Sequence, residues 1–273
     1  MSHHALERAN AAFWDVLCGW NLAQSAGITG RGEDDLRRFD ELYLQMYPYL
    51  EGYVDRKQLA GKRVLEIGLG YGTLGQLVAE RAREYHGVDI AAEPVAVMRR
   101  RLEWLDKDPA LVRQASALEL PYEPEMFDYV FSIGCLHHTG DLPRAVDEVY
   151  RVLKPGGRAV VMVYYRFALR RRSQAVRDWL HGRRGSEAEL RARYDANSSG
   201  VGPPHTDFVS RAEARKLFRR FARLRMDVRN FDNLGGGRIY IPRERLLSTL
   251  GRVLGLDLYI VADKASGLGG RAS

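Results

Sequence analysis

Short apolar runs alternate with amphipathic stretches along residues 61–165 of the 273-residue chain. The apolar runs have the length of buried strands, and the stretches between them have the periodicity of helices that bury one face. This alternation predicts an α/β fold, in which helices cover both faces of a parallel sheet. The five predicted strands are Arg63–Ile67, Glu84–Ile90, Leu111–Ala115, Phe127–Ile133 and Arg158–Tyr165.

Three helices are predicted between these strands, at Thr73–Ala82, Ala92–Leu105 and Leu142–Leu153. The last one should end at the sequence Lys154-Pro-Gly-Gly, because proline and glycine stop a helix. Further along, Ser210 and Glu213 form a capping-box pattern that predicts a helix to about Phe221. A strand at Ala222–Phe231, a helix at Arg243–Leu254 and a strand at Leu256–Ala262 bring the predicted sheet to seven strands.

The sequence divides into four regions by pattern. Residues 1–60 are predicted to be helical and rich in aromatic side chains, so we expect a helical lid. Residues 61–165 form the predicted core, and the arginine- and glycine-rich insertion 166–208 is expected to form a cap. Residues 209–273 are expected to complete the sheet.

Composition and charge restrict the classes of protein. The chain is 45% apolar and 28% charged, as is usual for a globular protein, and its formal charge is +7. The arginines are widely spread, which favours a solvated basic surface, with an anionic or membrane-associated partner as the alternative. No apolar stretch is long enough to cross a bilayer or to form a secretory signal, so we expect a cytoplasmic protein. The two cysteines lack metal-ligand spacing, and no metal site is expected.

A glycine-rich loop directly follows the first predicted strand. Gly68, Gly70 and Gly72 occupy alternate positions there, and Glu66 lies within the strand. Glycine allows the backbone to turn sharply and to approach a ligand closely. Asp89 ends the second strand, where a carboxylate can accept both hydroxyls of a ribose. NAD enzymes usually have the spacing G-x-G-x-x-G, so this spacing is a weak indication of a different nucleoside cofactor.

These features resemble the class I S-adenosylmethionine-dependent methyltransferases, especially the small-molecule enzymes of ubiquinone and menaquinone type and the O-methyltransferases of specialised metabolism. The segments Ala115–Tyr122, Phe127–Thr139 and Leu153–Gly157 extend the resemblance, although Ser116 stands where the family usually has aspartate. The resemblance implies a Rossmann-like, seven-stranded methyltransferase sheet and S-adenosylmethionine as the cofactor. The cofactor-binding residues that it implies are Glu66, Gly68, Gly70, Tyr71, Gly72, Asp89, Ile90, Ser116, Ala117, Leu118, Ile133 and Gly134.

Three histidines are the candidate catalytic residues. His137 and His138 follow the fourth strand, and His205 lies in the insertion with Asp207. Histidine titrates near neutral pH and can therefore remove a proton from a hydroxyl, while structural packing is the alternative for each of them. A further candidate pair is Tyr194 and Asp195. The residues expected to bind the acceptor are Trp14, Tyr47, Tyr194 and Asp207, with helix packing as the alternative for the aromatic ones.

We therefore expect an enzyme that transfers a methyl group from S-adenosylmethionine to a small-molecule acceptor. O-methylation is favoured, and N-methylation, C-methylation and RNA methylation are the alternatives. Nucleic acid is disfavoured because Ser132-Ile-Gly-Cys135 stands where base-methylating enzymes usually carry Asn/Asp-Pro-Pro-Tyr. Two further alternatives are a protein that binds the cofactor without catalysing a reaction, and a dehydrogenase. The sequence does not fix the oligomeric state, and a homodimer is one alternative.

Overall fold

The computed structural model describes residues 3–17, 20–180, 186–196, 200–236 and 239–266. Its main sheet has the order β3-β2-β1-β4-β5-β10-β7, and β6 pairs with β5 beside that path. β1 to β5 are parallel, whereas β10 is antiparallel to both β5 and β7. The strands are β1 (Arg63–Ile67), β2 (Glu84–Asp89), β3 (Val112–Gln114), β4 (Phe127–Ile133), β5 (Leu153–Tyr165), β6 (Phe208–Val209), β7 (Arg223–Arg229) and β10 (Asp257–Asp263).

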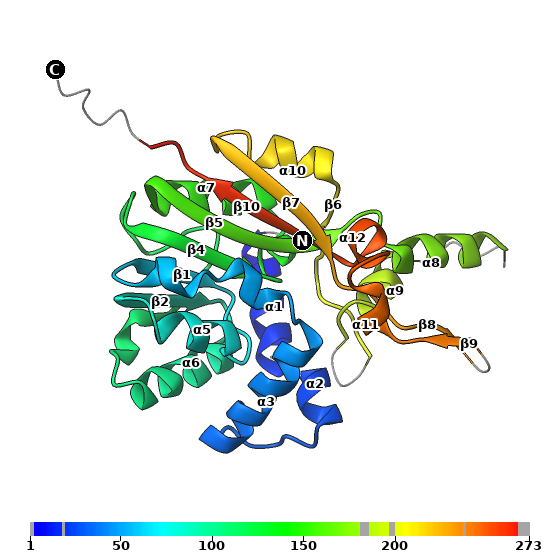
Figure 1. Cartoon of the computed structure of the whole chain (residues 1–273), viewed down its shortest axis with the longest axis horizontal. Coiled ribbons are helices and arrows are strands. Elements are labelled where there is room, and N and C mark those ends of the chain that lie inside the picture. The colour runs from blue at the N-terminus through cyan, green and yellow to red at the C-terminus, as the bar shows by residue number, and fades with distance from the viewer. Residues whose placement is uncertain (1–2, 18–19, 181–185, 197–199, 237–238, 267–273) are drawn as a thin grey trace.

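Helices cover both faces of this sheet, so the predicted Rossmann-like α/β fold is confirmed. Figure 1 shows α7 (Leu142–Val152) and α10 (Arg211–Leu217) on one face, and α5 (Thr73–Ala79) and α6 (Ala92–Trp104) on the other. The apolar positions of α7 recur at helical spacing: Ala145, Val146 and Val149 are buried in the same core cluster as the inner strands. The side chain of Asp141 accepts a hydrogen bond from the first turn of α7 and caps it.

The N-terminal region folds as short helices beside the sheet. They are α1 (His3–Leu17), α2 (Trp20–Ser25), α3 (Glu33–Met46), a 3-10 turn η1 (Leu50–Tyr53) and α4 (Arg56–Leu59). Asp40 of α3 accepts hydrogen bonds of 2.8 Å from both terminal nitrogens of Arg101, a buried residue of α6. Asp40 also accepts a 2.6 Å bond from the hydroxyl of Thr73. Because an unpaired buried guanidinium is costly, these bonds fix the N-terminal helices to the core.

The cap lies at one end of the sheet (Figure 1). It contains α8 (Leu169–Leu180), α9 (Glu187–Ala192), the hairpin of β8 (Leu234–Gly236) and β9 (Ile239–Ile241), α11 (Arg243–Leu246) and α12 (Gly251–Leu254). Residues 181–185 and 197–199 of the predicted insertion lie outside the described residues. The prediction of one helix over Arg243–Leu254 is wrong, because residues 247–250 separate two short helices. Within this break the N–H of Thr249 bonds to the carbonyl of Leu246, a tighter i→i−3 turn. Neither the hairpin nor β6 was expected.

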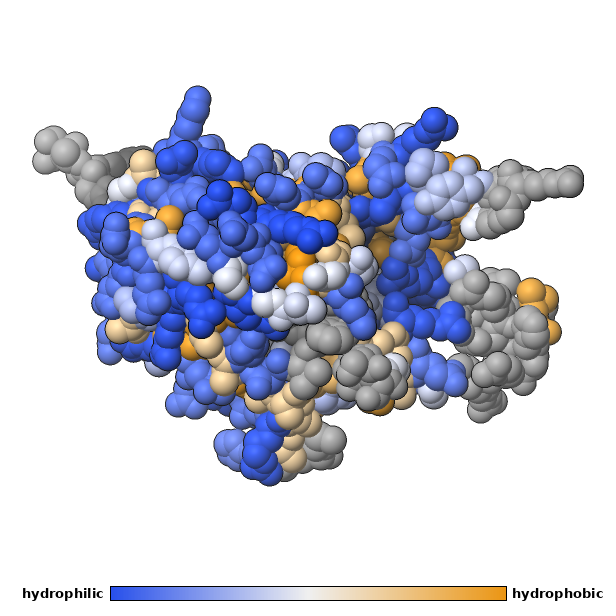
Figure 2. All heavy atoms as spheres, turned by 90° about the horizontal axis from the view of Figure 1, so that it is seen from below, coloured by the Kyte–Doolittle hydropathy of each residue, from blue (hydrophilic) through white to orange (hydrophobic). Residues whose placement is uncertain are grey.

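The fifth strand also begins earlier than predicted. Leu153 already pairs with Phe127 of β4, and the register shifts before Tyr129 pairs with Arg158. Lys154-Pro-Gly-Gly is therefore an irregularity inside β5 and not a separate turn before it. Among the described residues no helix is long and apolar enough to cross a membrane. Figure 2 shows one face of the molecule, which is mainly hydrophilic with small apolar patches.

Candidate functional site

A pocket lies at the carboxyl ends of β1, β2 and β4, where the glycine loop leaves β1. Gly68 and Gly70 line it and have φ values of 83° and 52°, a region that favours glycine. A Cβ on Gly68 would collide with Cys135, whereas a Cβ on Gly70 would meet no atom within 4 Å. The loop therefore packs tightly on one side and leaves open space for a ligand on the other.

Most of the predicted cofactor residues come together in this pocket. Those that line it are Gly68, Gly70, Asp89, Ile90, Ser116, Ala117, Leu118, Ile133 and Gly134. Glu66, Tyr71 and Gly72 are not among the lining residues. Glu66 accepts a hydrogen bond from the hydroxyl of Tyr85, the ring of Tyr71 stacks on that of Phe39 at 4.2 Å, and Gly72 precedes α5.

Asp89 connects the end of β2 to the glycine loop. One oxygen of its carboxylate accepts a 2.8 Å bond from the backbone N–H of Leu69, and the other accepts a 2.9 Å bond from that of Ala91. Burial raises the pKa of Asp89 to about 6, and the backbone hydrogen bonds oppose this rise. This rigid carboxylate lines the pocket at the end of β2, a position that fits the hydroxyls of a ribose.

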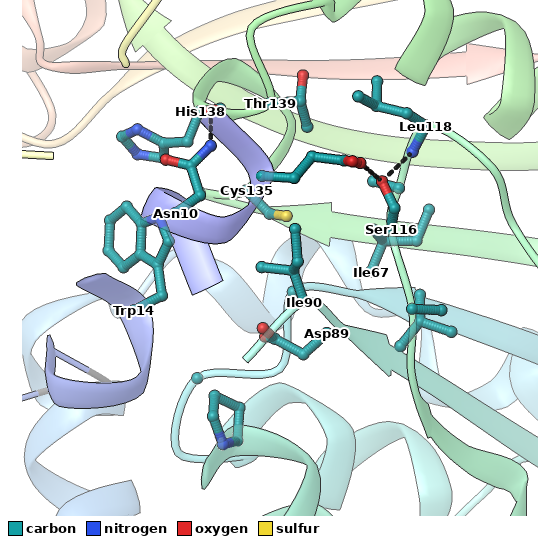
Figure 3. A pocket seen from close by; sticks show the side chains of 18 of the residues that line it. Asn10, Trp14, Ile67, Asp89, Ile90, Ser116, Leu118, Cys135, His138 and Thr139 are labelled. Carbon is teal, nitrogen blue, oxygen red and sulfur yellow. Dashed lines mark hydrogen bonds between the residues drawn. The ribbon is translucent and has the colours of Figure 1, made fainter. Parts of the chain in front are cut away.

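Glu7 of α1 is a pocket residue that the sequence did not predict. Its carboxylate accepts a 2.6 Å bond from the hydroxyl of Ser116, and that hydroxyl accepts a 3.1 Å bond from the backbone N–H of Leu118. Figure 3 shows Ser116 and Leu118 at one end of the pocket, and Asn10, Trp14 and His138 at the other. The only sequence signal for Glu7 was the helical pattern of residues 1–60, which does not indicate its partner.

His138 lines the pocket with a nearly buried imidazole. Its Nδ1 lies 2.8 Å from the carbonyl oxygen of His205 and 3.2 Å from the hydroxyl oxygen of Thr206. These two acceptors assign the proton to Nδ1 and leave the lone pair on Nε2. Trp14 packs against the imidazole with ring centroids 4.6 Å apart. Burial lowers the pKa of His138, so the ring is neutral at neutral pH and Nε2 can accept a proton.

Asp195 carries a carboxylate from the cap to His138. Its Oδ2 lies 3.7 Å from Nε2 of His138 and accepts a 2.6 Å bond from the hydroxyl of Tyr164 at the end of β5. Burial raises the pKa of Asp195, and its electrostatic interaction with His138 and the bond from Tyr164 oppose the rise. A carboxylate at this position stabilises a positive charge on the imidazole of His138.

The other predicted acceptor-site residues lie around this pair. His137 is fully buried and its ring packs between those of His138 and Tyr164, with centroids 4.1 and 4.3 Å away. The imidazole of His205 is partly exposed and pairs with Asp207 at 3.1 Å, so His205 reaches His138 only through its backbone carbonyl. Of Trp14, Tyr47, Tyr194 and Asp207, only Trp14 lines the pocket.

The sequence of this chain is similar to those of known methyltransferases. Residues 65–161 match the model of the methyltransferase domain family. The ubiquinone biosynthesis O-methyltransferase of Pseudomonas aeruginosa (strain LESB58) is 33% identical over 139 residues, which make up 50% of this chain and 59% of that protein. Phosphoethanolamine N-methyltransferase 2 of Caenorhabditis elegans is 31% identical over 105 residues, which make up 38% of this chain and 24% of that protein.

The fold is also similar to that of solved methyltransferase structures. The crystal structure of an S-adenosylmethionine-dependent methyltransferase from Mesorhizobium loti superposes with a TM-score of 0.53 and 18% identity, and covers 80% of this chain and 97% of that one. Residues 65–161 are therefore a class I S-adenosylmethionine-dependent methyltransferase domain, and S-adenosylmethionine is its cofactor. The matched parts span 24% of the phosphoethanolamine N-methyltransferase and 59% of the ubiquinone biosynthesis O-methyltransferase. The match therefore does not assign the substrate of either relative to this chain.

Proposed function

We propose that this protein transfers the methyl group of S-adenosylmethionine to a hydroxyl oxygen of a small-molecule acceptor. The observation that carries the proposal is His138, which lines the cofactor pocket and whose Nδ1 bonds to the carbonyl oxygen of His205, so that Nε2 is the nitrogen left to accept a proton. A hydroxyl needs such a base because it must lose its proton to become a good nucleophile. The names of the two relatives, which refer to ubiquinone biosynthesis and to phosphoethanolamine, support a small-molecule acceptor.

Different residues of the pocket would hold different parts of the cofactor. Asp89 would hold the ribose hydroxyls, and the backbone of the glycine loop, with Gly68 and Gly70, would hold the aminoacyl part. Glu7 and Ser116 would hold the edge of the adenine ring. When bound, S-adenosylmethionine supplies an electrophilic methyl group on a positively charged sulfur.

His138 and Asp195 then perform the proton transfer. Nε2 of His138 would take the proton of the acceptor hydroxyl as its oxygen accepts the methyl group that bound S-adenosylmethionine would supply, with the neutral thioether as the leaving group. The carboxylate of Asp195, 3.7 Å away, stabilises the imidazolium that results. The proton then passes to solvent. A general base of this kind contributes about 10²–10⁴-fold to the rate.

Helix α1 contributes three of the residues that line this pocket. The side-chain amide of Asn10 donates a 2.7 Å bond to the backbone carbonyl of His138, and Trp14 packs against the imidazole. Glu7 makes a further contact from the same helix to Ser116. These three contacts hold α1 against both the cofactor pocket and His138.

The test is a methyl-transfer assay on the full chain with methyl-labelled S-adenosylmethionine and a fractionated cell extract. We expect label in the small-molecule fraction, and we expect His138→Gln to lower transfer about 10²-fold or more while the affinity for S-adenosylhomocysteine stays unchanged. His86→Gln serves as the control, because His86 is also buried but pairs with Glu84 away from the pocket. Label in RNA or protein, or full transfer by His138→Gln, would contradict the proposal.

A further inference from the structure

The glycine loop between β1 and α5 has one side in the cofactor pocket and its other side against the N-terminal region. Gly68 and Gly70 line the pocket, whereas the side chain of Tyr71 is buried away from it. Tyr71 belongs to an apolar cluster whose other buried members come from residues 23–39 and from Val97 of α6. The loop is therefore held from behind by residues that do not line the pocket.

Arg101 of α6 makes a polar contact with the back of this loop. Its Nε donates a 2.8 Å hydrogen bond to the backbone carbonyl of Tyr71, and its side chain is almost fully buried. A Cβ on Gly72, which has a φ value of 77°, would lie 2.8 Å from Cδ of Arg101. Arg101 thus packs directly against the turn that ends the loop. Because a bond from a charged donor is stronger than a neutral one, Arg101 fixes the direction of one peptide group of the loop.

Asp40 of α3 sets the position of that guanidinium group. Its two carboxylate oxygens accept 2.8 Å bonds from the two terminal nitrogens of Arg101. The same carboxylate accepts a 2.6 Å bond from the hydroxyl of Thr73, the first residue of α5. A bidentate pair has a fixed geometry, so the position of α3 determines where Nε of Arg101 meets the loop.

The ring of Tyr71 is a second anchor for the loop. It stacks on the ring of Phe39, with centroids 4.2 Å apart and an interplanar angle of 17°. The guanidinium carbon of Arg31 lies 4.8 Å from the centroid of the Tyr71 ring, a cation–π contact. Phe39 and Asp40 are adjacent in α3, so this helix holds both the side chain of Tyr71 and, through Arg101, its backbone carbonyl.

We propose that Arg101, aligned by Asp40, and the ring of Tyr71 are positioning residues that hold the glycine loop in the conformation that binds S-adenosylmethionine. This inference rests on the proposed role of the loop in holding the aminoacyl part of the cofactor. Glycines give a loop many alternative conformations. A loop that adopts its binding conformation for only a fraction of the time has its affinity reduced by that fraction. The N-terminal helices therefore contribute to cofactor affinity from outside the pocket.

Calorimetric titration of S-adenosylhomocysteine into the full chain tests this role with matched variants. Arg101→Met removes the bond to Tyr71, while Asp40 keeps 17% of its side chain exposed to water. We expect the affinity to fall about tenfold, as when one molecule in about ten keeps the loop in its binding conformation. Lys264→Met is the control and should bind like the parent protein. Lys264 is also a buried cation that bonds to a backbone carbonyl, that of Leu153, but it does not line the cofactor pocket.

Hydrogen exchange measured by mass spectrometry separates positioning from a general loss of stability. In Arg101→Met without ligand, the backbone amides of residues 68–73 should exchange at least about tenfold faster than in the parent, because the loop opens locally. Saturation with S-adenosylhomocysteine should restore their protection. Lys264→Met should leave the exchange of this segment unchanged. Tyr71→Leu, which exchanges one buried apolar side chain for another, should behave like Arg101→Met and keeps the proposal testable if Arg101→Met does not fold.

The outcomes separate this inference from the proposal on which it rests. Unchanged affinity in either folded variant of the loop anchors, an equal loss of affinity in Lys264→Met, or faster exchange spread evenly over the chain overturns the positioning role. If the parent protein binds the nucleoside in these cases, the proposed role of the glycine loop stands and only the positioning role is wrong. If the parent protein does not bind the nucleoside, both fail.

Discussion

The hydroxyl of Ser116 donates a 2.6 Å hydrogen bond to the carboxylate of Glu7, a residue 109 positions earlier in the chain. In the methyltransferases that the sequence resembles, aspartate usually stands at the position of Ser116. Here the N-terminal helix α1 brings a carboxylate to the same end of the pocket, and the serine hydroxyl holds it in place. The cofactor pocket is therefore complete only when α1 is docked.

This relationship predicts that Glu7 contributes to cofactor affinity. Glu7→Ala removes one hydrogen-bond acceptor for the adenine edge, so the affinity for S-adenosylhomocysteine should fall about tenfold, or about 1.4 kcal/mol. Isothermal titration calorimetry measures the change. Glu51→Ala is a suitable control, since Glu51 pairs with Arg56 on the surface away from the pocket. Equal affinity of Glu7→Ala and the parent protein would show that Glu7 does not contact the cofactor.

Asp195 should control the pH at which His138 becomes protonated. The carboxylate raises the pKa of His138 against the lowering effect of burial, so Asp195→Asn should lower that pKa further. The acid limb of the pH–rate profile should then move to lower pH while the maximal rate falls, because the imidazolium loses its partner. Titration of the histidine ring signals by NMR measures the same shift without an acceptor. A shift of the His138 titration to higher pH would contradict this account.

Glu66 should make folding stability depend on pH. Burial raises its pKa to about 8, well above the value of a solvated carboxyl group, so the folded protein holds a proton that the unfolded chain has lost. Its contribution is complete below the pKa of the unfolded chain, at about 4.3, and is lost as the pH rises through about 8. Glu66→Gln, which cannot ionise, should therefore gain stability relative to the parent protein between about pH 5 and pH 9.

Urea unfolding of both proteins at several pH values tests this prediction. Glu80→Gln provides the control, because Glu80 is exposed and carries its carboxylate near the end of α5. Should the difference in unfolding free energy between Glu66→Gln and the parent stay constant across that pH range, Glu66 would not be protonated in the folded state.

The core of the fold could be predicted because its signals are local. The inner strands are short and mostly buried, and β1 and β4 have the predicted bounds. The glycine loop follows β1 and Asp89 ends β2, so their meeting at one edge of the sheet follows from the parallel topology. Glu66 shows the limit of this approach: it alternates with Leu65 and Ile67 along β1 and so points to the opposite face.

The rest of the site depends on contacts between distant segments. The contacts of Glu7 with Ser116 and of Asp195 with His138 join the N-terminal helix and the cap to the core, and no periodicity in the sequence relates them. The two-residue strand β6 and the three-residue strands of the β8–β9 hairpin are too short to show a strand pattern in the sequence; β6 pairs with β5, and β8 pairs with β9.

The most direct test of the central claim is calorimetric titration of S-adenosylhomocysteine into the parent protein, Asp89→Ala and the surface variant Asp147→Ala. Asp89 accepts one backbone bond from Leu69 of the glycine loop and another from Ala91, and in our proposal it also holds the ribose hydroxyls. Loss of two charge-assisted hydrogen bonds should weaken binding by about 10²-fold or more in Asp89→Ala. Asp147→Ala should bind like the parent. Unchanged affinity of a folded Asp89→Ala protein would contradict the account, because the nucleoside would then bind elsewhere.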